Sequence, residues 1–217
     1  MARFTIIIGN KNYSSWSLRG WIALRHCTED FDEVMIPLRK PTTSADIRAH
    51  SPAGKVPSLH DGDLLVWDSL AICEYLADIF PDAGLWPEDR AARAHARAAS
   101  AEMHSGFQAL RHDMPMNCRA SLRGLGATQA ALTDIARIEV IWDECRERFG
   151  GGGDFLFGHF TIADAMYAPV ASRLKTYQPE LGPTAKAYVD AIHGLPAMQE
   201  WIEAASAESD RLVEMEI

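Results

Sequence analysis

Short strand and helix patterns alternate through the first 80 or so residues, and this order constrains the fold more than any other feature of the chain. The turn sequence Asp61-Gly62-Asp63 predicts that the last two of these strands form a hairpin. The predicted order, β-α-β-α-β-β-α, is that of an α/β domain. The apolar patterns place strands at residues 4–9, 33–38, 56–60 and 64–67, and helices at 15–26, 44–50 and 69–80.

Helical patterns alone fill the rest of the chain. They lie at residues 88–112 and 129–149, from Thr161 onward, and at 185–192 and 196–205. Pro169 is expected to kink or end the helix that starts at Thr161, because proline lacks the backbone N–H. The stretch Pro-Asp-Ala-Gly-Leu-Trp-Pro is typical of a linker. We therefore expect an α/β domain at residues 1–81, a linker at 82–87 and an all-helical domain at 88–217.

The composition excludes several classes of protein. A net charge of −9 argues against a nucleic-acid-binding surface, and no apolar run approaches the roughly 18 residues of a membrane span. The four cysteines stand far apart and the histidines show no ligand spacing, so we expect no metal site. Cys73 and Cys145 lie on apolar helix faces, which indicates reduced core thiols. Together with the lack of a signal-peptide pattern, this predicts a cytoplasmic protein.

The segment Tyr13-Ser14-Ser15-Trp16-Ser17-Leu18-Arg19 places hydroxyl groups where a strand ends and a helix begins. The first turn of a helix has free backbone N–H groups and a partial positive charge, so it stabilises an anion. A hydroxyl at this point can donate a hydrogen bond to a bound thiolate and keep the thiolate ionised at neutral pH. A serine here is also an ordinary helix N-cap, and the segment alone does not decide between the two roles.

Two further motifs stand at the start of a strand and of a helix. Pro57 begins the third strand, and a cis Val56–Pro57 bond would turn the Val56 N–H and C=O outward to pair with an extended peptide. A trans bond would merely start an edge strand. Ser69 begins the next helix, where it can cap the helix and also hold a ligand carboxylate, while Asp68 would face a ligand amine.

Two features of the helical half have structural interpretations. Thr161-x-x-Asp164 resembles a capping box, with Asp in the place of Glu. Met103, His104 and Phe107 cluster near the end of a long helix. Such a stripe is typical of core packing, and it is equally compatible with the wall of an apolar substrate pocket.

Five motifs together resemble those of the glutathione S-transferases, in the order and at the spacing of that family. The resemblance covers essentially the whole chain and is nearest the zeta (maleylacetoacetate isomerase-like) class, whose catalytic loop reads Ser-Ser-Cys-Ser-Trp-Arg. It implies a bacterial enzyme with a thioredoxin-like N-terminal domain, an all-helical C-terminal domain, glutathione as co-substrate and a homodimer. The motifs are Ser14–Arg19 with Ile22-Ala23-Leu24, Lys55–Leu59, Asp68–Leu76, Leu85-Trp86-Pro87 and Thr161–Asp164.

The resemblance also implies which residues bind glutathione. Val56, held by a cis bond to Pro57, pairs with the cysteinyl backbone. Asp68 and Ser69 bind the γ-glutamyl end. Lys55 stands where the zeta class often has glutamine, and it is expected to reach the glycine carboxylate. Further candidates for the same pocket are Trp16, Arg39 and His50.

Three hydroxyl groups remain candidates for activating the glutathione thiol. Ser14 lies five residues before Arg19, at the position of the zeta serine and of the omega cysteine. Ser15 lies four residues before Arg19, which is the theta spacing. Tyr13 is the third candidate, since other classes use a tyrosine. Trp16 stands where zeta enzymes have cysteine, and this leaves the isomerase activity of that class open.

The chemistry that these residues support is attack by a thiolate. A free thiol with a pKa near about 8.5 is only a few per cent ionised at pH 7, and hydrogen bonds from a hydroxyl and a helix end lower that pKa to roughly 6.5–7. The sequence therefore predicts a glutathione transferase that acts on small apolar electrophiles. A glutathione-dependent cis-trans isomerase of the zeta type and a noncatalytic glutathione or ligand binder are the alternatives.

Overall fold

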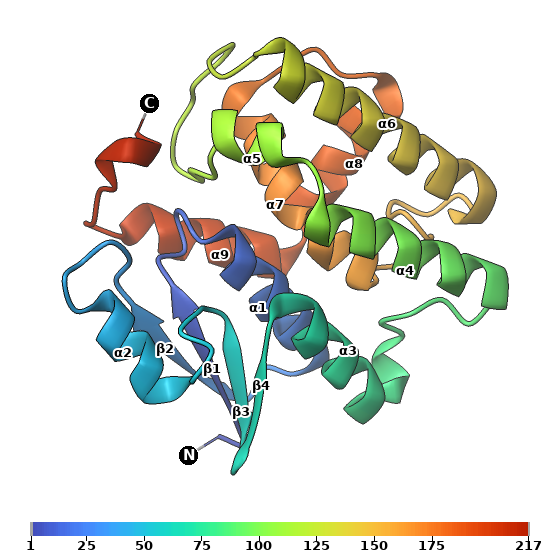
Figure 1. Cartoon of the computed structure of the whole chain (residues 1–217). Coiled ribbons are helices and arrows are strands. Elements are labelled where there is room, and N and C mark those ends of the chain that lie inside the picture. Colours follow the sequence, from blue (N-terminus) through green and yellow to red (C-terminus); the bar gives the residue numbers. More distant parts are fainter. Residues whose placement is uncertain (1, 217) are drawn as a thin grey trace.

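In the computed structural model, which describes residues 2–216, four strands form one mixed sheet with helices on both faces (Figure 1). The strands are β1 (Phe4–Gly9), β2 (Phe31–Ile36), β3 (Ser58–Asp61) and β4 (Leu64–Trp67), in the spatial order β2-β1-β3-β4. β1 runs parallel to β2 and antiparallel to β3, and β3 and β4 form the predicted antiparallel hairpin. The accompanying helices are α1 (Ser15–Cys27), α2 (Thr43–His50) and α3 (Ser69–Ile79), so the predicted thioredoxin-like order is confirmed.

The alternation of side chains along β1 decides which helices cover which face of the sheet. Ile6 and Ile8 belong to the main core, which α1 and α3 share. Ile7 points to the opposite face and packs with Ile36 and with Ile47 of α2. These three isoleucines of β1 are at most 1 % exposed. The domain therefore has three layers, with α2 on one side of the sheet and the α1–α3 pair on the other (Figure 1).

Helices alone follow, as the sequence predicts. They are α4 (Arg90–Ser105), α5 (Gln108–Asp113), α6 (Gln129–Phe149), α7 (Ile162–Tyr177), α8 (Pro183–Gly194) and α9 (Pro196–Ala207), with short 3₁₀ turns η1 (Pro81–Ala83) and η2 (Val213–Met215). α7 is buried along almost its whole length and packs against α1, α4 and α8. Its contact with α1 joins the helical half to the sheet domain (Figure 1).

The N-terminus of α7 is closed by a carboxylate, as the capping-box motif predicts. Asp164 is fully buried and accepts hydrogen bonds from the N–H groups of Leu156 (3.1 Å) and Thr161 (2.8 Å). It also accepts from the hydroxyls of Thr161 (2.9 Å) and Tyr188 (3.0 Å). The expectation that α7 could end at Pro169 is wrong, because the helix continues to Tyr177.

Two strands begin or end where their pairing requires rather than where the apolar pattern predicts. β2 spans Phe31–Ile36 instead of 33–38, because its parallel pairing with β1 stops at the Gly9–Ile36 pair and Pro37 has no N–H to donate. β3 begins at Ser58 instead of residue 56, after the cis Val56–Pro57 bond. The cis bond itself is the one that the family resemblance implies.

The helix predicted at 88–112 is in fact two helices, α4 and α5. Gly106 ends α4, and a Cβ at that position would lie only 2.8 Å from the Glu102 carbonyl oxygen. Phe107 then takes a φ of 60°, which a continuous helix does not allow. The break turns α5 away from the axis of α4, and it brings residues of both helices to the site described below.

None of the helices within residues 2–216 is long and apolar enough to cross a membrane. In the same part of the chain, no group of three or more His, Cys, Asp or Glu side chains is placed to hold a metal ion. Cys73 and Cys145 are buried free thiols, as predicted.

Candidate active site

A pocket of about 880 Å³ lies between the sheet domain and the helical half. Its walls come from the start of α1, the loop after β2, the turns before β3 and α3, and parts of α4, α5 and α7. Most of the residues predicted from the sequence meet here. Those that line the pocket are Tyr13, Ser14, Ser15, Trp16, Arg39, Lys55, Val56, Pro57, Asp68, Ser69 and His104.

Three predicted site residues lie elsewhere. His50 ends α2 outside the pocket lining, and its carbonyl accepts a hydrogen bond from the His60 ring (3.0 Å). Met103 and Phe107 pack in the main core, where they are 0 % and 7 % exposed. The prediction that these two form a pocket wall is therefore corrected to core packing. His104, the next residue along α4, lines the pocket instead.

Ser14 caps α1, and the hydrogen bonds within residues 2–216 indicate that its hydroxyl proton has no acceptor there. Its Oγ accepts from the Ser17 N–H (3.3 Å) and lies 2.7 Å from the Ser17 Oγ. The fully buried Ser17 Oγ accepts from the Gly9 N–H (3.0 Å), and within residues 2–216 it has no other oxygen than Ser14 Oγ to donate to. Ser17 therefore donates to Ser14, and the Ser14 proton stays free for a ligand in the pocket.

The other two candidate hydroxyls differ sharply. Ser15 occupies the first position of α1 and lines the pocket, and its hydroxyl makes no hydrogen bond within the described residues. The Tyr13 hydroxyl donates to the Glu216 carboxylate and accepts from Arg119 (2.6 Å) and from the Leu212 N–H (3.2 Å). Burial and the bond to Glu216 raise the pKa of Tyr13. The geometry thus favours the two serines over Tyr13 as the thiol donor.

The turn before α3 presents free polar groups to the same pocket. Ser69 stands at the first position of α3 and is 1 % exposed, and its Oγ has no hydrogen-bond partner in the part of the chain that the structure describes. A buried hydroxyl beside the positive end of a helix is suited to a carboxylate. Lys55 and Val56 line the pocket across from this turn.

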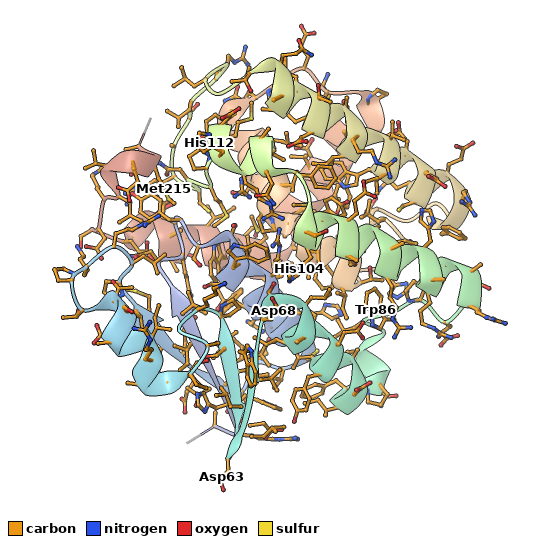
Figure 2. All side chains as sticks on the ribbon, in the orientation of Figure 1. Asp63, Asp68, Trp86, His104, His112 and Met215 are labelled. Carbon is orange, nitrogen blue, oxygen red and sulfur yellow. The ribbon has the colours of Figure 1, made fainter. Side chains whose placement is uncertain are left out.

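Asp68 links this turn to the helical half. Its φ of 73° is uncommon for a residue other than glycine, and such backbone is often found at binding sites. One carboxylate oxygen caps α3 by accepting from the Leu70 N–H (2.9 Å), and the other lies 2.8 Å from His104 Nε2. Figure 2 shows Asp68 and His104 side by side where α3 and α4 approach each other.

Two arginines lie beside Trp16: Arg111, which lines the pocket and which the sequence analysis missed, and Arg19, which is buried behind the pocket lining. The guanidinium carbon of Arg111 is 4.8 Å from the centroid of the Trp16 ring, and that of the fully buried Arg19 is 4.3 Å away. Arg173 of α7 lines the pocket as well. The Trp16 ring also meets the His104 ring edge-on, with centroids 5.2 Å apart.

Arg19, Arg111 and Arg173 form no ion pair with an acidic residue in the described part of the chain. Each arginine donates to a backbone carbonyl instead. Arg19 donates to Met166 (3.0 Å), Arg111 to Gly106 (2.9 Å) and Arg173 to Met114 (2.8 Å). None of the ion pairs formed within residues 2–216 includes them. Burial and the neighbouring positive charges lower the pKa of Arg19 well below its ordinary value, and burial followed by Arg111 lowers the pKa of Arg173 to about 10. Unpaired cations around a pocket favour an anionic ligand.

A sequence signal for Arg173 exists in hindsight. It stands in a helix whose other residues are almost all apolar or small, and a charged residue fully buried in such a helix is rare without a function. Arg111 gives no comparable signal, because an arginine in a short polar helix is ordinary.

The chain matches the models of both domains of one family. Residues 13–79 match the glutathione S-transferase N-terminal domain, and residues 120–204 match the glutathione S-transferase C-terminal domain. A probable maleylacetoacetate isomerase from Caenorhabditis elegans is 29% identical over 174 residues, which cover 78% of each chain.

Solved structures with lower identity share the fold. Maleyl pyruvate isomerase, described as a bacterial glutathione S-transferase in the zeta class, superimposes with a TM-score of 0.72 at 23% identity and covers 95% of this chain and 100% of its own. A glutathione transferase homologue from Burkholderia, with bound glutathione, gives a TM-score of 0.71 at 23% identity over 94% and 99% of the two chains. With both domains matched in order, and with the sheet domain and helices arranged as described, this protein belongs to the glutathione S-transferase family.

Proposed function

We propose that this protein is a glutathione-dependent enzyme in which the Ser14 hydroxyl stabilises the glutathione thiolate. The observation that carries the proposal is the Ser14–Ser17 hydroxyl pair at the N-terminus of α1, from which we infer that Ser17 donates and that the Ser14 proton is free for a ligand. One or two charge-assisted hydrogen bonds together with the helix end favour a thiolate by about 2–3 kcal/mol. At about 1.4 kcal/mol per pKa unit, the pKa of bound glutathione falls to roughly 6.5–7.

The rest of the glutathione site follows from the pocket. Val56 pairs with the backbone of the cysteinyl residue, and the Ser69 hydroxyl receives the γ-glutamyl carboxylate at the start of α3. Asp68 faces the γ-glutamyl amine. Lys55 and Arg39 bind the glycine carboxylate. The bound glutathione in a structural relative supports glutathione as the co-substrate. The homodimer that the resemblance implies stays a prediction.

The second substrate, we propose, carries at least one carboxylate. Arg111 and Arg173 line the pocket and have no acidic partner among residues 2–216, so an apolar electrophile would leave both charges unpaired. The name of the relative from Caenorhabditis elegans, a probable maleylacetoacetate isomerase, fits an acid substrate. The thiolate would add to the cis double bond, the resulting single bond would rotate, and departure of the thiolate would restore glutathione and leave the trans product. Trp16 in place of the zeta cysteine would form the floor beside the reacting bond.

A transferase that acts on small apolar electrophiles is the second candidate. The apolar walls that Trp16, Pro115 and Met116 give the same pocket support it. In a transferase the sulfur bond to the electrophile is kept and glutathione is consumed, whereas an isomerase regenerates it.

The test combines one binding measurement with two turnover assays. The ultraviolet absorbance of the bound thiolate is followed across pH for the wild type, Ser14→Ala and Ser15→Ala. We expect Ser14→Ala to raise the bound-thiol pKa by a unit or more. Turnover of maleylacetoacetate without loss of glutathione supports the isomerase, and loss of glutathione with an aryl halide supports the transferase. Retention on a glutathione matrix with no turnover of either would contradict both and leave a binder.

A further inference from the structure

The loop that carries the catalytic candidates is held by a distant part of the chain. We call residues 10–14 the serine loop and residues 208–216, which follow α9, the strap. The Glu208 carboxylate of the strap accepts from the backbone N–H groups of Lys11 (2.6 Å) and Asn12 (3.3 Å). The Tyr13 hydroxyl accepts from the Leu212 N–H and donates to Glu216, which stands 203 residues further along. The serine loop therefore owes much of its hydrogen bonding to the strap.

Arg119, which precedes α6, ties the serine loop and the strap together. Its guanidinium donates to the Tyr13 hydroxyl (2.6 Å) and to the Glu216 carboxylate (2.9 Å). It also donates to the carbonyls of Glu208 (2.8 Å) and Asp210 (2.9 Å) in the strap. The result is one closed network of Tyr13, Arg119 and Glu216.

This network is largely but not fully buried. Tyr13 is 3 % exposed, and the side chains of Arg119 and Glu216 are 14 % and 25 % exposed. A charge-assisted bond at such a site holds its partners more firmly than an exposed pair, because water competes less for each group. The strap also places Met215 on the pocket wall (Figure 2). The same segment thus anchors the serine loop and closes one side of the pocket.

We propose that Arg119 and Glu216 are positioning residues for the thiol-activating serine, a role that rests on the proposed function. By fixing the Tyr13 hydroxyl they hold the neighbouring Ser14 at the start of α1, with its free proton available to the thiol. A hydrogen bond to a thiolate depends steeply on distance and angle, so a small shift of the serine loop weakens it. Tyr13 thus serves the reaction without touching the sulfur.

The experiment compares Glu216→Gln, Tyr13→Phe and the double variant with the wild type. Each single change removes a strong link of the network and keeps side-chain volume. We expect each to lower kcat about tenfold and to raise the bound-thiol pKa by about one unit. The kcat of the double variant should be no lower than that of either single variant, because both changes remove the same Tyr13–Glu216 hydrogen bond. Arg119→Lys, which keeps the charge but not the forked donor geometry, should have an intermediate effect.

Glu203→Gln is the matched control. It removes an exposed carboxylate from α9, just before the strap, and within residues 2–216 Glu203 forms no ion pair and does not touch Tyr13. We expect its kcat and bound-thiol pKa to stay within about twofold and a few tenths of a unit of the wild type. A merely structural strap would lower the Tm of the network variants and leave the thiol pKa of the folded protein unchanged.

The outcomes separate this inference from the proposed function. A wild type that ionises glutathione, together with network variants that do so at the same pKa, would overturn the positioning role alone. A large loss of kcat in Tyr13→Phe with no loss in Glu216→Gln would also overturn the positioning role, since Tyr13 would then act directly on the thiol. A wild type that does not ionise bound glutathione at neutral pH would overturn both proposals.

Discussion

Helices α1 and α7 pack against each other, and each has a hydroxyl residue as its N-cap, yet the two N-termini differ in their hydrogen bonding. At α7 the Asp164 carboxylate accepts four hydrogen bonds and no ligand can reach it, since it is fully buried. At α1 there is no acidic residue in the first turn, and the Ser14 hydroxyl lines the pocket. The first arrangement stabilises the fold, and the second leaves a positive helix end for a ligand.

Electrostatics explains the difference between α1 and α7. A carboxylate in the first turn neutralises the partial positive charge of the helix end. At α1 such a carboxylate would repel a thiolate. The N-terminus of α1 therefore carries no acidic residue, and packing supplies the stability of this helix.

The largest effect on stability should come from removing the carboxylate at the N-terminus of α7. Asp164→Ala removes the acceptor of four buried donors, so we expect the free energy of unfolding to fall by about 3–5 kcal/mol. Urea denaturation measures the loss. Asp89→Ala is the control, because the exposed Asp89 caps α4 with one bond to the Ala92 N–H, and we expect a loss of only about 1 kcal/mol there. Equal losses in the two variants would contradict the contrast drawn between α7 and an ordinary cap.

Ser14→Ala should have the next largest effect, on activity rather than on stability. Loss of one donor to a developing or resting anion typically costs about a hundredfold or more in rate, so kcat/KM should fall by about that factor. The free energy of unfolding should fall by only about 1 kcal/mol, the usual cost of a lost N-cap. Steady-state kinetics and denaturation are measured on the same preparation. A stability loss without a rate loss would mean that Ser14 is only a cap.

Removing one pocket arginine should act on one class of substrate. Arg173→Met keeps the volume of the buried side chain but removes its charge, so kcat/KM for a carboxylate substrate should fall about tenfold or more. The rate with an uncharged aryl halide should stay within about twofold. Denaturation should show a loss of about 1–3 kcal/mol, because the Met114 carbonyl loses its hydrogen bond from Arg173. Equal losses for both substrates would argue against carboxylate recognition by Arg173.

Ser15→Ala should have the smallest effect. Ser15 lies beside Ser14 at the pocket, but no other residue orients its hydroxyl within the described part of the chain. We expect kcat/KM to change by less than about threefold and the bound-thiol pKa by less than half a unit. A loss of kcat/KM larger than that of Ser14→Ala would show that Ser15, and not Ser14, activates the thiol.

The sequence by itself determined the order of strands and helices, the two-part architecture and the capping box at Asp164. These features depend on periodicity and on contacts over a few residues, such as the alternation of Ile6, Ile7 and Ile8 or the four-residue span from Thr161 to Asp164. The family resemblance added most of the predicted pocket residues and the cis bond before Pro57, which the structure contains.

Only the tertiary structure decided which of these groups remain free. The Tyr13 hydroxyl donates its proton to Glu216, a residue 203 positions away, so it is not free to donate to a thiol. Arg173 reaches the pocket because α7 is buried in the centre of the molecule. Met103 turned out to be core and His104 to line the pocket, because α4 presents a different face to each neighbour. Local patterns set how the chain can fold, whereas the satisfaction of a hydroxyl or the pairing of a charge depends on groups that only the folded chain brings together.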